Sequence, residues 1–448
     1  MEPILLACLV LGLVLALIAL RVPVAFALGV SASLGLLIFF SWRPGSAFDL
    51  ARGLRPTLSI LTSTPFEFIS NYELSMIPLF IALGHVAYAA GITTDLYRAL
   101  RIFLARVPGG LALASVVGCG GFSAITGSSV ACASAMGKIA VPEMLRYRYN
   151  PQLATGAVAA GGTLGSLIPP SLLFVIYAIF TEQSVKNLFL AGIIPGLLSL
   201  VGYMITVIVW SRLRPSDAPQ PDEVSLPTAA RIAALVSVWP VVTLLAIIIV
   251  GIYGGLFTPT EAAAVSLTLA ILIGFGRRQL TFASLVASLR ETVLQTSMIF
   301  LIAIGAKIFV SFVSLTRVSP VFLDWLQSSQ ASLVLIIVAI VLLYLVLGMF
   351  LDSIGILVLT LPFTVPLVEG YGLNLIWFGV VVIKLLEIGL ITPPIGLNVF
   401  VIKSVAPPQV SLEAIFRGVG WFLLLDFVVL LLILLFPSLS LLIPNSAR

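Results

Sequence analysis

Four short polar segments interrupt long apolar stretches of this 448-residue sequence, and two of them contain adjacent prolines. These two read TLGSLIPPSLLFVI (163–176) and EIGLITPPIGLNVF (387–400). Because proline has no N–H group, a proline pair leaves carbonyl groups of the preceding helical turn without their usual donors. Such carbonyls are ligands for a hard cation, and the half-helix that restarts after the break points N–H groups at anions.

The other two polar segments are turns rich in hydroxyl groups, GFSAITGSSVACASAMG (121–137) and GMFLDSIGIL (348–357). Ser123, Thr126, Ser128 and Ser129 gather in the first turn, and Asp352 lies in the second. A carboxylate inside a membrane costs roughly 2.5–3.5 kcal/mol on insertion scales unless it is paired or functional. For any one of the four segments, a helix kink that serves only packing is as good an explanation as a binding site. Four together favour a mid-membrane site for cations and an anionic substrate.

Other polar residues in apolar segments have two interpretations. Lys384 and Glu387 are spaced i, i+3 and can pair with each other, or they can take part in transport. Lys307 can extend its ammonium group to the membrane interface, and His85 is either a proton carrier or a packed bundle residue. The sequence contains neither a GxxxxGK[ST] phosphate loop nor a Ser/His/Asp arrangement. We therefore predict neither ATP hydrolysis nor any other enzyme activity.

The composition of the chain indicates which kind of secondary structure must position these polar residues. Hydrophobic residues make up 60% of the chain and charged residues only 9%, and the mean hydropathy is +1.21. Many uncharged runs approach or exceed the roughly 20 residues of a membrane-spanning helix. The sequence therefore predicts an all-α polytopic membrane protein whose N-terminal run is a retained first span. The net charge of +5 is modest, so no nucleic-acid partner is inferred.

An internal repeat relates the two halves of the chain. One gap-free shift of 224 residues moves Pro142 onto Pro366, Asn150 onto Asn374, and the first proline pair onto the second. We interpret residues 1–220 and 221–448 as two similar halves, joined by a proline-rich linker at 211–231. Each half contains about five spans and one re-entrant hairpin. In the first half, the spans are 4–20, 24–40, 75–92, 150–180 (broken) and 187–210, and the hairpin is 109–141. In the second half, they are 232–254, 258–276, 292–313, 374–404 (broken) and 413–437, and the hairpin is 331–368.

An odd number of spans per half gives the two halves opposite orientations in the membrane, as in inverted-repeat transporters. Most arginines between the spans face the cytoplasm if the N-terminus lies outside, so the positive-inside rule favours that orientation. The amphipathic segment 94–106 is expected to lie in the membrane interface.

Several motifs resemble one family in order along nearly the whole chain: RVPVAFALG, MIPLFIALG, FSAITGSSVA, GSLIPPS and GLITPPIGLNVF. They are similar to the large transmembrane subunit of tripartite ATP-independent periplasmic (TRAP) transporters, of the DctM type. The resemblance implies two inverted repeats, an elevator-type movement and sodium coupling without ATP. It also implies two partners, a small four-helix membrane subunit and a periplasmic binding protein that delivers an organic acid anion.

The resemblance also implies particular ligands. One sodium site would use Ser123 and Thr126 with the carbonyls of Gly165, Ile168 and Pro169, and the other Asp352 with Gly389, Thr392 and Pro393. The substrate carboxylate would be bound by Ser128, Ser129, Ser353 and Asn398.

These expectations describe sodium-driven symport of an organic acid anion, such as a dicarboxylate or a sugar acid. The protein would lie in a bacterial or archaeal cytoplasmic (inner) membrane, with its N-terminus in the periplasm. The alternative is a stand-alone sodium/organic anion symporter of related fold that needs no binding protein.

Overall fold

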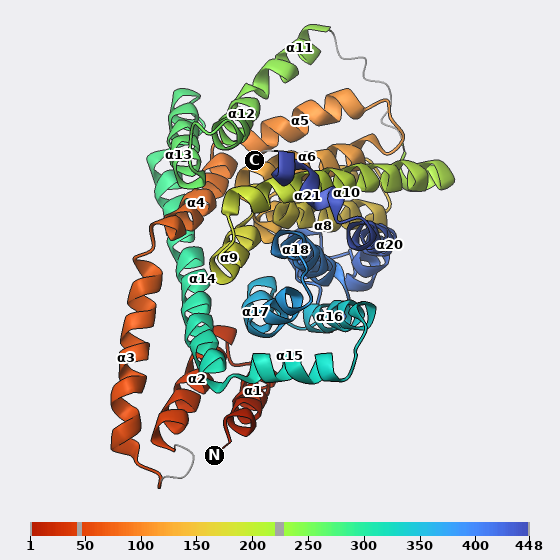
Figure 1. Cartoon of the computed structure of the whole chain (residues 1–448). Helices are drawn as coiled ribbons and strands as arrows, with labels where there is room; N and C mark the ends of the chain where they lie inside the picture. Colours follow the sequence, from red (N-terminus) through yellow and green to blue (C-terminus); the bar gives the residue numbers. More distant parts are fainter. Residues whose placement is uncertain (1, 43–46, 220–227, 447–448) are drawn as a thin grey trace. The chain divides into compact units, whose positions relative to one another are not determined.

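A computed structural model describes residues 2–42, 47–219 and 228–446, and every regular element in these ranges is a helix (Figure 1). Two short 3₁₀ turns, Tyr72–Ser75 and Pro215–Asp217, accompany the α-helices. The α-helices are α1 (Pro3–Ala19), α2 (Val24–Ser41), α3 (Leu50–Ile69), α4 (Met76–Ala89), α5 (Ile92–Leu104), α6 (Gly110–Thr126), α7 (Ser129–Arg146), α8 (Pro151–Leu167), α9 (Leu172–Thr181), α10 (Val185–Leu213), α11 (Thr228–Ser237), α12 (Trp239–Tyr253), α13 (Pro259–Gly276), α14 (Phe282–Thr316), α15 (Val318–Ser328), α16 (Leu333–Gly348), α17 (Ser353–Gly370), α18 (Leu375–Ile391), α19 (Leu397–Val405), α20 (Leu412–Leu435) and α21 (Ser438–Ser446).

The predicted all-α membrane class is confirmed. Nine helical stretches in the described part of the chain are long and apolar enough to cross a membrane. Helix pairs α6/α7 and α16/α17 occupy the segments predicted as hairpins, and α8/α9 and α18/α19 occupy the predicted broken spans. Part of the predicted linker, residues 220–227, lies outside the described residues.

Helix α3 is an element that the apolar runs did not predict. Three charged residues, Arg52, Arg55 and Glu67, lower its mean hydropathy, so the sequence does not indicate a membrane span there. Its start is nevertheless defined locally, because the Asp49 side chain accepts hydrogen bonds from the N–H groups of Ala51 and Arg52 at 3.1 and 3.3 Å. Helices α15 and α21 were not predicted either.

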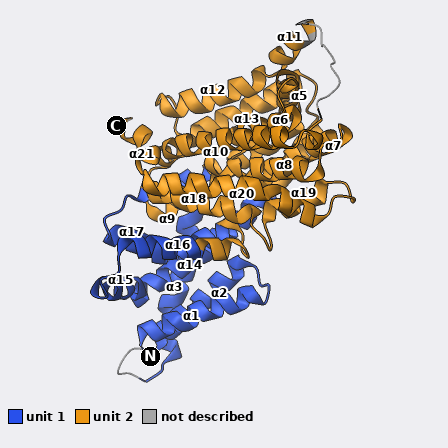
Figure 2. Ribbon diagram, turned by 90° about the vertical axis from the view of Figure 1, so that its right-hand side faces the viewer, with its two compact units in different colours: residues 1–75, 294–343, 354–375 blue, residues 76–293, 344–353, 376–448 orange. Residues whose placement is uncertain are grey.

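The helices form two compact units (Figure 2). Unit 1 contains residues 1–75, 294–343 and 354–375, and unit 2 contains residues 76–293, 344–353 and 376–448. Within unit 1, helices α2 and α14 pack closely through small residues. A Cβ atom placed on Gly29 would lie 3.7 Å from the Cα atom of Gly305.

Helix α8 forms the core of unit 2. Every residue from Leu153 to Leu167 is buried, and the helix contacts α6, α7, α10 and α20. Glycines permit this close packing: a Cβ atom on Gly156 would lie 2.5 Å from the backbone carbon of Gly418 in α20. The first of the polar breaks therefore sits at the end of a helix that is enclosed on all sides within its unit.

Candidate functional site

The first break is the segment between α8 and α9, residues 168–171. The Ile168 N–H group donates to the Leu164 carbonyl at 2.9 Å, which completes the last turn of α8. The Ser171 hydroxyl then caps α9, accepting from the Phe174 N–H group at 3.4 Å, and donates to the Ser166 carbonyl. Pro169 and Pro170 between them are buried. Pro169 has no N–H group to donate to the carbonyl of Gly165, four residues earlier.

The tip of the first hairpin lies directly against this break. Gly127, with φ of +62°, separates α6 from α7 and accepts a hydrogen bond from the Leu172 N–H group at 3.1 Å. A Cβ atom on Gly127 would lie 2.5 Å from the Pro170 carbonyl oxygen, so this position requires glycine for space as well as for its backbone angle. Gly165 is equally confined, because its Cβ atom would lie 2.7 Å from the Ser128 carbonyl carbon.

The hydroxyl groups predicted for this region lie on α6, on α7 or at the residue that caps α7. The Thr126 hydroxyl donates to the Phe122 carbonyl at 3.2 Å, and Ser123 contacts the Cys132 thiol at 3.5 Å. Ser128 caps α7 through the Ala131 N–H group at 3.4 Å, and the Ser129 hydroxyl donates to the Thr163 carbonyl at 3.2 Å. Ser129 also contacts the Ser166 hydroxyl. Seven predicted residues are thus gathered at one hairpin tip and one break: Ser123, Thr126, Ser128, Ser129, Gly165, Ile168 and Pro169.

The second break lies between α18 and α19 and is more exposed than the first. The Thr392 hydroxyl donates to the Ile388 carbonyl at 2.6 Å, while Pro393 is exposed. The end of the second hairpin's first helix approaches α18 closely, because a Cβ atom on Gly389 would lie 2.8 Å from the Cα atom of Gly348. Asp352 and Ser353, which follow in the turn to α17, are both half-buried.

Asn398 on α19 reaches from the second half of the sequence to the first. It is fully buried, and its side-chain amide donates to the Ala159 carbonyl of α8 at 3.3 Å. Its Oδ1 atom is buried without a hydrogen-bond partner among the described residues. An unsatisfied buried acceptor of this kind is an available contact for a ligand.

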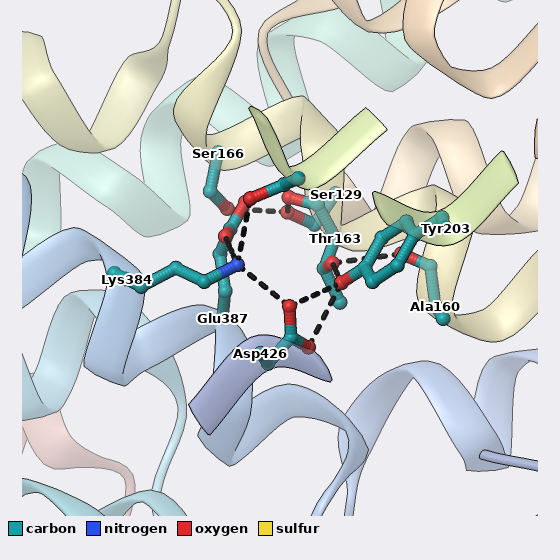
Figure 3. A network of polar contacts seen from close by, with 9 residues as sticks. Ser129, Ala160, Thr163, Ser166, Tyr203, Lys384, Glu387 and Asp426 are labelled. Atoms are coloured by element: carbon teal, nitrogen blue, oxygen red, sulfur yellow. Dashed lines mark hydrogen bonds and ion pairs between the residues drawn. The ribbon is translucent and has the colours of Figure 1, made fainter. Parts of the chain in front are cut away.

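Figure 3 shows a charged cluster that the sequence predicted only in part. The Lys384–Glu387 pair is confirmed, with Nζ 3.1 Å from Oε2. The structure adds Asp426 of α20, whose Oδ1 atom lies 2.7 Å from the same Nζ, and Ser199 of α10, which accepts from it at 3.0 Å. All four residues are fully buried.

The cluster continues through the Tyr203 hydroxyl, which donates to the Asp426 carboxylate at 2.8 Å and lies 3.1 Å from the Thr163 hydroxyl of α8 (Figure 3). We call these six residues the buried ion cluster: Thr163, Ser199, Tyr203, Lys384, Glu387 and Asp426. Sequence reasoning could have found Asp426, because it is the single acidic residue in the apolar run WFLLLDFVVLLL. The sequence around Ser199 and Tyr203 gives no comparable sign of a role in the cluster.

Comparisons with known proteins agree with this architecture. Residues 11–439 match the family model described as "Tripartite ATP-independent periplasmic transporter, DctM component". The chain is 33% identical to the C4-dicarboxylate TRAP transporter large permease protein DctM of Pseudomonas aeruginosa, over 93% of both chains. It is also 33% identical to the sialic acid TRAP transporter large permease protein SiaM of Vibrio cholerae, over 84% of this chain and 87% of that protein.

A solved structure supports the fold alone. The YdaH transporter of Alcanivorax borkumensis superimposes with a TM-score of 0.59 over 98% of both chains, at 15% identity. Together, the match along residues 11–439 and the two permease relatives identify a transport protein and not an enzyme. The chain therefore belongs to the DctM family, the DctM component of tripartite ATP-independent periplasmic transporters.

Proposed function

We propose that this chain is the large membrane subunit of a sodium-driven symporter for an organic acid anion. The observation that carries the proposal is the pair of proline breaks 224 residues apart, each within the unit that also holds the adjoining hairpin tip. The membrane potential favours such a mechanism, because each net positive charge entering the cell gains about 2.3 kcal/mol per 100 mV. The sodium gradient then drives accumulation without ATP.

The first sodium ion is assigned to Ser123 and Thr126 with the carbonyls of Gly165, Ile168 and Pro169. The lack of an N–H group at Pro169 supports this assignment, because it releases the Gly165 carbonyl from α8. The second sodium ion is assigned to Asp352 with Gly389, Thr392 and Pro393. Pro393 stands four residues after Gly389 and has no N–H group to donate to its carbonyl, which accepts instead from the Thr392 N–H group at 3.3 Å.

The anionic substrate is assigned to the starts of the helices that follow the hairpin tips and the second break. Ser128 and Ser129 lie at the start of α7, and Ser353 begins α17. N–H groups at helix starts attract anions. Asn398, near the start of α19, adds a side-chain amide with an unpaired buried oxygen. The relatives carry C4-dicarboxylates and sialic acid, so the proposed substrate is a dicarboxylate or a sugar acid.

Inverted repeats and an elevator movement are part of the proposal. Helix bounds support the repeat, because the shift of 224 residues moves α8 (Pro151–Leu167) onto α18 (Leu375–Ile391) at both ends. The same shift moves the start of α7 onto the start of α17. Unit 2, which holds both breaks, is proposed as the body that moves with the substrate.

The remaining components follow from the family. Its description is tripartite, and the relatives are named large permeases, so we propose a small four-helix membrane subunit and a periplasmic binding protein as partners. The complex would lie in a bacterial or archaeal inner membrane with the N-terminus of this chain in the periplasm.

Uptake by the reconstituted transporter tests the proposal. The chain, its small subunit and its binding protein would be supplied with radiolabelled succinate, as a C4-dicarboxylate, and with radiolabelled sialic acid. We expect one probe to accumulate under an inward sodium gradient and not under a choline gradient of equal strength. Accumulation that persists without sodium would contradict the coupling, and accumulation by this chain alone would favour the stand-alone symporter.

A further inference from the structure

The buried ion cluster connects the last turns before both breaks. Thr163 stands two residues before Gly165, and Glu387 stands two residues before Gly389. The two residues are related by the same shift of 224 positions as the breaks themselves. The cluster therefore contacts corresponding points of α8 and α18, about half a turn before the Gly165 and Gly389 carbonyls assigned to sodium.

At the centre of the cluster, every hydrogen-bond donor of the Lys384 ammonium group has an acceptor. The Lys384 ammonium group has three N–H bonds and three acceptors, on Ser199, Glu387 and Asp426, at 3.0, 3.1 and 2.7 Å. The Tyr203 hydroxyl joins Asp426 to Thr163. Helices α10 and α20 thus tie the end of α18 to the end of α8 (Figure 3).

Stability alone is a weak reason to keep such a cluster. A buried ion pair often contributes no more than well-packed apolar residues of the same size, because removing charges from water offsets their attraction. Here a lysine and two carboxylates are fully buried in apolar helices. Ionisable groups inside a membrane are, by default, candidates for a functional role.

We propose that the buried ion cluster is a positioning device that couples the two breaks, so that cation binding at one break favours the binding geometry of the other. The inference depends on the sodium sites proposed above. Its residues act through the backbone of α8 and α18 and do not themselves contact the ion. Lys384 acts as a fixed internal cation that holds three helices, and the Tyr203 and Thr163 hydroxyls extend this hold to α8.

Two threonines on α8 provide a matched test. Thr163 and Thr155 are both fully buried, and the hydroxyl of each lies within hydrogen-bond distance of a carbonyl oxygen of its own helix, at 2.7 and 2.6 Å. Only Thr163 contacts the cluster. Thr163→Val removes the link to Tyr203 with little change in volume, and Thr155→Val makes the same chemical change without touching the cluster.

Sodium binding is the measurement, with the purified chain in lipid nanodiscs titrated by calorimetry and ionic strength held constant with choline chloride. We expect a Hill coefficient above 1 for the wild type and for Thr155→Val. For Thr163→Val it should fall towards 1. The half-saturating sodium concentration should also rise about 5-fold or more, the lower end of typical coupling between sites. Tyr203→Phe, which removes the same link from its other side, should reproduce the Thr163→Val result.

The outcomes separate this inference from the proposed function. If the wild type binds no sodium, both fail. If it binds sodium with a Hill coefficient near 1, or if Thr163→Val and Tyr203→Phe keep the wild-type coefficient, only the coupling fails. An equal loss in Thr155→Val would also overturn it, because the effect would then follow from any altered threonine on α8. All three substitutions leave the buried charges in place, so the comparison does not require a variant with an unpaired ion.

Discussion

Asp352 is the acidic side chain among the residues assigned to bind sodium, and its role can be tested at the scale of one residue. It lies half-buried in the turn between α16 and α17, where a carboxylate can neutralise a cation more strongly than a carbonyl can. Asp352→Asn keeps the shape and removes the charge. A hydrogen bond or contact to a charged group contributes about 1.5–3 kcal/mol, so we expect the half-saturating sodium concentration for uptake to rise about 10-fold or more.

Asp324→Asn is the control for this change. Asp324 is exposed on α15, far along the sequence from either break, and the substitution removes the same charge from the chain. Its sodium dependence should match the wild type. A similar shift in both variants would mean that net charge and not a sodium ligand sets the dependence, and the assignment of Asp352 would be wrong.

At the scale of the element, the function proposed for the breaks depends on carbonyls that a continuous helix would use for its own hydrogen bonds. Pro169→Ala supplies an N–H group four residues after Gly165 and allows the helix bond that proline prevents. We expect this variant to fold and to need several-fold more sodium for half-maximal uptake, because a carbonyl that accepts a hydrogen bond is a poorer cation ligand. Pro195→Ala is the matched control, since Pro195 is buried within the unbroken helix α10. Equal sodium dependence in both variants would argue against released carbonyls as ligands.

Sequence alone predicted those elements whose signals are local or repeated. Uncharged runs located most of the apolar helices, and the shift of 224 residues located both breaks together. Helix α3 was missed because Arg52 and Glu67 lower its hydropathy, although Asp49 marks its start. The Lys384–Glu387 pair could be predicted from the sequence because the two residues are about one helical turn apart. The rest of the cluster was not, because Asp426 lies 42 residues from Lys384 and 223 residues from Tyr203, and only the fold brings them together.

At the scale of the whole molecule, the proposed inverted repeat requires an odd number of crossings in each half, and the positive-inside rule then sets the direction. Ser70 and Ser216 test both points. Both are exposed, and under the proposed topology three spans separate them, α4, the broken pair α8/α9 and α10. Ser70→Cys should therefore lie outside and Ser216→Cys inside. Each substitution would be made with the exposed Cys8 replaced by serine, while Cys119 and Cys132 are buried.

A membrane-impermeant maleimide applied to intact cells provides the measurement, after the outer membrane is opened where one is present. Ser70→Cys should react at once, and Ser216→Cys only after the inner membrane is permeabilised. The reverse pattern would keep the odd number of crossings but place the N-terminus in the cytoplasm. Labelling of both residues from the same side would mean an even number of crossings between them, and the inverted repeat would then be wrong whichever way the chain is inserted.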